Sequence, residues 1–178
     1  MFKFKNLIVL GPLIYAIHHF EEHIIFNFRE WRLKYFSDNN AISTEAILII
    51  LSSLLLLFIF IHLVKKNKAS AHIVLFFLMT TQIINALFHI YFSFYFNDFS
   101  PGAITSVIFY LPINFFIIKA ALNEKFIKSY WEVFILFSLG ALTFGLFEMF
   151  GPIVIGISVA MTPIYYFFIN KLEQFQNS

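Results

Sequence analysis

The segment His18-His19-Phe20-Glu21-Glu22-His23 places five ionisable side chains in a stretch of the chain that is otherwise apolar. A carboxylate at the centre of a membrane-spanning helix costs roughly 2.5–3.5 kcal/mol, so such a cluster requires partners or a function. Histidine nitrogens and carboxylate oxygens one helical turn apart can also bind zinc, iron or manganese. The segment therefore predicts a functional site.

Two polar residues further along the chain are candidates to complete this site. Asn85 and His89 share a face at a spacing of four residues, and His18, Glu21 and Glu22 fall within one helical arc of about 100°. We predict that these five residues are catalytic and that His18, Glu22 and His89 hold a divalent metal ion. In this interpretation Glu21 or Glu22 stays off the metal as a general base, and Asn85 orients a ligand or substrate.

Other interpretations of the same residues remain open. A metal-free site would use a buried carboxyl group as the acid and a histidine as the base. A structural cluster would instead fix the packing of the helices. Thr105 is either a helix-start residue or part of the site, and Glu148 is either an interfacial carboxylate or a site member.

The composition indicates an integral membrane protein. Of the 178 residues 60% are hydrophobic and only 12% are charged, whereas soluble domains carry about 25% charged residues. The chain has no cysteine, which excludes disulfides, thiolate metal ligands and a cysteine nucleophile. We expect one all-α domain over residues 1–178, a polytopic membrane helix bundle.

A hydrocarbon core of roughly 30 Å needs about 20 apolar residues per helix, which predicts six transmembrane helices. Four lie at about 6–28, 44–64, 71–95 and 102–122, and Gly151-Pro152 divides the long run from Val133 to Asn170 into two more. Pro12 and Pro163 are expected to bend the first and last helices without ending them. Ser100-Pro101 is typical of a helix start, with serine as the cap.

Basic residues predict the orientation in the cell membrane. Nine of the twelve Lys and Arg residues fall on the side of the amino terminus, and only Arg29, Arg32 and Lys34 fall on the other. Both termini are therefore expected in the cytoplasm, and the predicted site in the outer leaflet. His62 and His72 flank the basic loop and are expected at the interface, while Gln82 and Asn114 are expected to form hydrogen bonds between helices.

Three short motifs resemble those of the HXXEE family of integral membrane proteins. They are His18-x-x-Glu21-Glu22, Asn85-x-x-x-His89 and Pro101-Gly102-x-x-Thr105, in this order and spread over most of the chain. The resemblance implies a helical membrane domain with a shared polar site, and it implies no particular activity.

We therefore expect a small membrane-embedded enzyme that acts on a lipid or another apolar small molecule, in contact with membrane lipids and with no nucleic-acid partner. A homo-oligomer is compatible with the sequence. A proton-coupled carrier is the first alternative, but a chain this short without an inverted repeat would need a dimer to frame a pathway. A non-catalytic membrane scaffold is the second.

Overall fold

The computed structural model describes residues 3–37 and 42–177, and within them the chain is helical with no strand. Labels α and η mark α-helices and π-helical turns. The elements are, in chain order, α1 (Phe4–Ile8), α2 (Leu10–Phe20), η1 (Glu21–Ile25), α3 (Phe28–Tyr35), α4 (Thr44–Lys65), α5 (Lys68–Leu78), η2 (Met79–Ile84), α6 (Asn85–Tyr95), α7 (Ala103–Thr105), η3 (Ser106–Tyr110), α8 (Leu111–Asn123), α9 (Tyr130–Phe150) and α10 (Ile153–Asn177).

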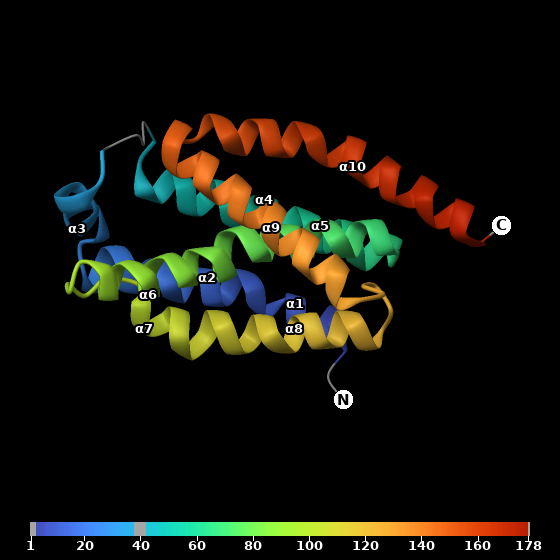
Figure 1. The fold of residues 1–178 in the computed structure, drawn as a ribbon, viewed down its shortest axis with the longest axis horizontal. Coiled ribbons are helices and arrows are strands. Elements are labelled where there is room, and N and C mark those ends of the chain that lie inside the picture. Colours follow the sequence, from blue (N-terminus) through green and yellow to red (C-terminus); the bar gives the residue numbers. More distant parts are fainter. Residues whose placement is uncertain (1–2, 38–41, 178) are drawn as a thin grey trace.

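The helices form an elongated bundle in which consecutive passes run in opposite directions (Figure 1). The successive passes are α1 to η1, α4, α5 to α6, α7 to α8, α9 and α10, and the first and last described residues lie toward the same end. The short helix α3 lies at the opposite end and joins the first pass to the second.

Five continuous helical stretches among the described residues are long and apolar enough to cross a membrane. They cover 44–65, 68–95, 103–123, 130–150 and 153–175. The first pass is not among them, because its helix is interrupted at Val9. Pro12 has no N–H to donate to the Ile8 carbonyl, which explains why α1 ends there and α2 starts anew. The first pass lies where the sequence predicts it. The expectation that Pro12 only bends its helix is wrong, because the helix is interrupted at Val9.

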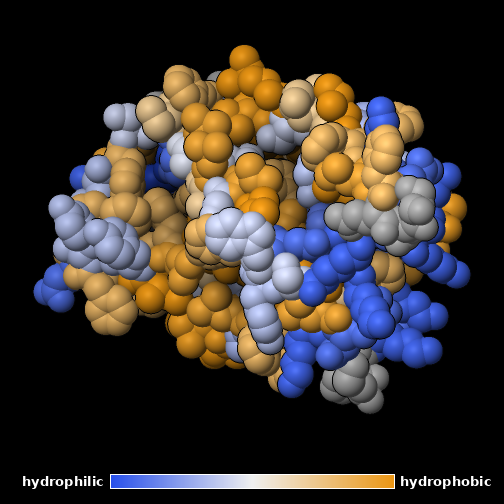
Figure 2. Space-filling view, turned by 45° about the vertical axis from the view of Figure 1, so that its right-hand side comes forward, coloured by the Kyte–Doolittle hydropathy of each residue, from blue (hydrophilic) through white to orange (hydrophobic). Residues whose placement is uncertain are grey.

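The exterior of the bundle is apolar, as expected of a surface that faces lipid. Figure 2 shows hydrophobic side chains over much of the visible face, with hydrophilic side chains gathered toward one part of it. On α10, for example, Phe167 and Phe168 are exposed. The long α9 and α10 bury few of their residues within the chain. These features make the protein an integral membrane protein.

The helix ends follow the sequence at one predicted turn and depart from it at another. Gly151, with a φ of 70°, ends α9 before Pro152, and α10 continues through Pro163. Ser100, in contrast, does not cap a helix. The next helix begins only at Ala103, after Gly102 with a φ of 98°, so the expected helix start at Ser100-Pro101 is wrong by two residues.

Buried polar side chains join three passes near the middle of the bundle. Gln82 on η2 donates a hydrogen bond of 2.9 Å to the Gly11 carbonyl, and Asn114 on α8 donates one of 2.8 Å to Gln82. Gln82 and Asn114 therefore form the interhelical hydrogen bonds expected from the sequence. Around them packs an apolar core drawn from most of the passes, including Phe4, Ile8, Leu55, Val74, Leu75, Leu78, Ile117 and Leu136.

Candidate functional site

Three π-helical turns lie next to the predicted site residues. The turn η1 carries Glu21 and Glu22, η2 ends immediately before Asn85, and η3 begins immediately after Thr105. In η1 the N–H of Phe26 bonds to the Glu21 carbonyl, five residues back. A π-turn of this kind changes the face that the following residues occupy and is frequent at functional sites. The three turns thus bring polar residues from separate passes to one place.

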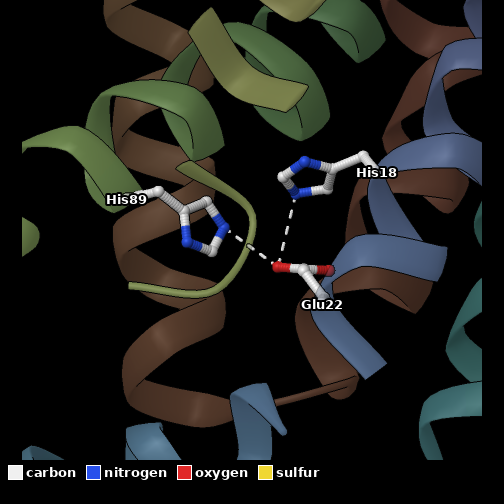
Figure 3. A group of neighbouring side chains, drawn as sticks. All are labelled: His18, Glu22 and His89. Atoms are coloured by element: carbon white, nitrogen blue, oxygen red, sulfur yellow. Dashed lines mark ion pairs between the residues drawn. The ribbon is translucent and has the colours of Figure 1, made fainter. Parts of the chain in front are cut away.

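Glu22 lies at the centre of this cluster, between two buried histidines (Figure 3). Its Oε1 atom is 3.3 Å from Nε2 of His18 and 2.9 Å from Nε2 of His89. His18 and Glu22 come from the first pass and His89 from α6, and both imidazole rings point at the same carboxylate. Both histidines are fully buried.

The other ring nitrogen of each histidine contacts a hydroxyl group. Nδ1 of His18 is 2.8 Å from Oγ1 of Thr105, and Nδ1 of His89 is 2.9 Å from Oγ of Ser100. Thr105 also donates to the Gly102 carbonyl at 3.3 Å, so it accepts a hydrogen bond from His18. This arrangement assigns the hydrogen of His18 to Nδ1 and leaves the lone pair of Nε2 directed into the site.

Asn85 contacts the same nitrogen of His18. Its Nδ2 atom lies 3.0 Å from Nε2 of His18, and since an amide N–H can only donate, this contact also requires a lone pair on Nε2. A cation at Nε2 would replace this hydrogen bond and free the Asn85 amide to orient another ligand.

Glu21 holds the start of α7. Its two oxygens accept hydrogen bonds from the backbone N–H groups of Gly102 (3.1 Å), Ile104 (3.1 Å) and Thr105 (2.7 Å). The first N–H groups of a helix have no partner within the helix, and here a side chain from another pass supplies one. Glu21 therefore caps α7 and positions Thr105 beside His18.

Gly102 is the point of closest approach between this loop and the site. A Cβ atom added there would lie 2.8 Å from Cε1 of His18, 3.0 Å from Cε1 of His89 and 3.1 Å from Cγ of Glu22. Its φ of 98° also belongs to a region that residues with a side chain rarely adopt. Glycine is therefore required at this position by the backbone and by the histidines.

The geometry of His18, Glu22 and His89 fits a metal ion. One ligand atom from each lies within 4.8 Å of the others. Ligands about 2.0–2.1 Å from a tetrahedral zinc ion lie roughly 3.3 Å from one another, which is close to the two distances from Glu22. The hydroxyl groups on both Nδ1 atoms match the way in which outer partners orient metal-binding histidines. All five predicted residues thus lie together, with Glu22 and the two histidines as the candidate ligands.

A cavity of about 900 Å³ opens beside Glu22. Its polar end contains His19, Glu22, His23 and Asn85, and its remaining length is largely apolar. The apolar walls come from α4, α5, α9 and α10 and include Leu51, Leu54, Phe58, Phe77, Phe144, Phe147, Ile157 and Met161.

Glu148 lies at the polar end of this cavity. It forms a 2.9 Å ion pair with Arg32 of α3, which ties that short helix to the end of α9. At the other side of α3, Tyr35 donates a 2.8 Å hydrogen bond to Asp98. This bond raises the pKa of the Tyr35 phenol, because ionisation would remove the donated hydrogen. Glu148 therefore lines the cavity and anchors α3.

The opposite end of the bundle holds more buried polar groups than the sequence suggested. His62 and His72 lie near the basic loop as expected, but both side chains are buried inside the protein. Nδ1 of His62 is 3.0 Å from Oγ of Ser70, and Nδ1 of His72 is 3.0 Å from the hydroxyl of Tyr165. Neighbouring passes therefore cover both side chains beside this loop.

Sequence reasoning missed several parts of the site. Ser100 was expected to cap a helix, yet it contacts His89, and Gly102 was noted only within a motif. The apolar walls of the cavity come from passes with no polar pattern to mark them. The signal that could have found Ser100 and Gly102 was their place in a motif that also contains Thr105.

Comparison with known proteins agrees with the motifs. The sequence profile described as "Protein of unknown function with HXXEE motif" matches residues 9–117, more than half of the chain. The matched part contains all five predicted site residues and Thr105, and it ends before α9. No curated protein and no solved structure matches the chain. On this evidence the chain belongs to the HXXEE-motif family of proteins of unknown function.

Proposed function

We propose that this protein is a membrane-embedded, metal-dependent enzyme that acts on a lipid or a similar apolar substrate. The observation that carries the proposal is the convergence of two imidazole nitrogens on one oxygen of Glu22, at 3.3 and 2.9 Å. With the hydrogen of His18 on Nδ1, two electron-rich atoms face each other at the first of these distances. A divalent cation between them would stabilise this arrangement and offset the cost of burying the carboxylate.

Each residue then has a distinct task. His18, Glu22 and His89 hold the ion, which we expect to be zinc, iron or manganese, and which would supply Lewis-acid activation of a substrate or water. Thr105 and Ser100 fix the orientation of the two rings from the far side. Both oxygens of Glu21 accept hydrogen bonds from backbone N–H groups, so we assign it to positioning and not to proton transfer.

The cavity supports an apolar substrate. Its volume of about 900 Å³ lies near the upper end of the range for small-molecule pockets, roughly 300–1,000 Å³. The long apolar part would hold a hydrocarbon chain, and the polar end would place the head group beside Glu22 and His23. Arg32, which is paired with Glu148, lies at the same end and would add positive charge near an acidic head group.

One observation favours a proton-coupled carrier as the second candidate. The cavity extends from Glu22 to Tyr165 of α10, and Tyr165 contacts the buried His72, which lies 3.5 Å from Glu132. Titratable groups therefore occur at both ends of one cavity, as a proton pathway would require. We rank this function second because the intervening walls are largely apolar.

The test uses protein reconstituted into vesicles made from a total lipid extract of the expression host, with zinc, manganese or ferrous ions added. Mass spectrometry of the lipids should show at least one species consumed at least tenfold faster with wild-type protein than with the Glu22→Gln variant. His62→Gln changes a buried histidine that also contacts a serine hydroxyl, but at the other end of the bundle. This control variant should keep wild-type turnover.

If no lipid species is consumed with any of the three metal ions, the proposed enzymatic function is contradicted. If the same vesicles showed proton flux that depends on Glu22, the carrier would replace it. Absence of both activities together with absence of bound metal would leave the non-catalytic scaffold.

A further inference from the structure

Two histidines on the first pass stand outside the cluster already described. His19 and His23 are one helical turn apart, and their ring centroids are 4.4 Å from each other. They occupy a face of the helix different from that of His18, and both line the large cavity beside Glu22. Both are partly exposed, in contrast to the fully buried His18 and His89.

The carboxylate of Glu22 lies between the two groups of histidines. Its Oε1 atom faces His18 and His89, whereas its Oε2 atom is 3.7 Å from Nε2 of His23. One ligand atom each from His19, Glu22 and His23 lie within 4.8 Å of one another, the same limit that the buried group meets. A carboxylate that offers one oxygen to each of two sets of histidines has the geometry of a bridging ligand.

We propose that His19, Glu22 and His23 form a second divalent cation site and that Glu22 bridges the two ions. The proposal rests on the metal site of the proposed function and adds a second ion to it. Bridged pairs of this kind hold their metals about 3.5–4 Å apart and can bind both the attacking and the leaving oxygen of a substrate. Nitrogen and carboxylate ligands suit zinc, manganese and iron.

The two positions would differ in access. The ion of the first site would be bordered by buried side chains and by the loop at Gly102, and it would meet the cavity on the side of Glu22 and Asn85. The ion of the second site would face the cavity, because both of its histidines line it. We therefore assign the binding of substrate to the second, cavity-facing ion.

Charge balance then indicates the class of substrate. Two divalent cations that share one carboxylate carry excess positive charge, which is costly at the depth of a membrane. The oxygens of Glu21 are already used by the backbone of α7. The cavity-facing ion therefore needs an anionic ligand, and a lipid with a phosphate or carboxylate head group supplies one together with a chain for the apolar cavity.

The test measures manganese in detergent-purified protein that has been stripped with a chelator, reloaded with Mn²⁺ and freed of excess ion. Elemental analysis should give about two Mn²⁺ per wild-type chain and about one for His23→Gln. Electron paramagnetic resonance should show a magnetically coupled pair in the wild type and a single uncoupled ion in His23→Gln. His62→Gln, the buried histidine at the far end, should match the wild type in both measurements.

Each other result would contradict the second site, the bridging role of Glu22 or both metal sites. One uncoupled Mn²⁺ in both the wild type and His23→Gln would overturn the second site and leave the first intact. Two uncoupled ions would overturn the bridging role of Glu22. No bound Mn²⁺ in wild type would contradict both sites. If circular dichroism shows that His23→Gln does not fold, His19→Gln gives the same count, because it removes a ligand of the same ion.

Discussion

Glu21 and Glu22 are neighbours in the sequence, but their carboxylates contact different kinds of group. The oxygens of Glu21 accept three backbone hydrogen bonds from the loop and first turn of α7. Those of Glu22 face only histidine side chains among the ion-pair partners described above. Substitution of the two residues should therefore have different effects on stability.

Glu22→Gln should remove bound metal without lowering stability. The change keeps the size of the side chain and removes a buried charge, whose desolvation costs several kcal/mol by order of magnitude. We expect metal content to fall at least tenfold and the thermal midpoint to stay equal or rise. A midpoint well below that of wild type, with no metal in either protein, would favour the structural interpretation of the cluster.

Glu21→Ala should destabilise the fold. Three backbone N–H groups would lose their acceptor, and each unsatisfied buried donor costs about 1–3 kcal/mol. We expect a total loss of at least about 3 kcal/mol, read from denaturant unfolding in detergent micelles. Glu30→Ala on the exposed surface of α3 is the matched control and should change stability by less than about 0.5 kcal/mol. Equal stability of the two variants would refute the capping role of Glu21.

The loop before α7 and the three π-turns are the elements that shape the site. Their positions could not be predicted from hydrophobic periodicity, since a π-turn adds a residue without changing the apolar character of the helix. The shared face of Asn85 and His89 was nevertheless predictable from their spacing of four residues, because both lie within the regular helix α6 and contact the first pass. A Ser-Pro pair is typical of a helix start, and the sequence does not show that the Ser100 hydroxyl contacts His89 instead of capping a helix.

Gly102→Ala should disturb this loop and the site together. The new methyl group would lie within about 3 Å of both imidazole rings, on a backbone with a φ of 98°. Strain and overpacking of this kind each cost about 1–3 kcal/mol, so both stability and metal retention should drop.

The matched control for this substitution is Gly156→Ala in α10, where an added Cβ meets open space. It should be neutral or slightly stabilising, because alanine is a better helix former than glycine. Tolerance of alanine at position 102 with full metal content would show that the loop does not constrain the histidines.

The whole molecule follows the sequence in its number of passes and its apolar exterior. These features depend on composition and on the lengths of apolar runs, which the chain displays directly. The cavity could not be predicted in the same way. The cavity forms where α9 and α10 meet α4 and α5. Packing between apolar helices that are distant in the sequence cannot be predicted from the spacing of polar residues.

Orientation in the membrane gives a prediction for the complete chain. The excess of lysine beside the termini predicts that Ser178 is cytoplasmic and that Ser37, close to α3, is external. Because the chain has no cysteine, Ser37→Cys and Ser178→Cys each introduce a single label site. An impermeant maleimide applied to intact cells should label only the first. Reversed labelling would place the site in the inner leaflet.

X-ray absorption on zinc-loaded protein tests most directly whether the cluster around Glu22 binds metal. The absence of cysteine from the chain excludes protein thiolates, so the predicted first shell is nitrogen and oxygen at about 2.0–2.1 Å. Outer-shell scattering from imidazole should be present and should weaken in His18→Ala. Zinc that is lost on dialysis, or a shell of oxygen alone without imidazole scattering, would contradict the metal site.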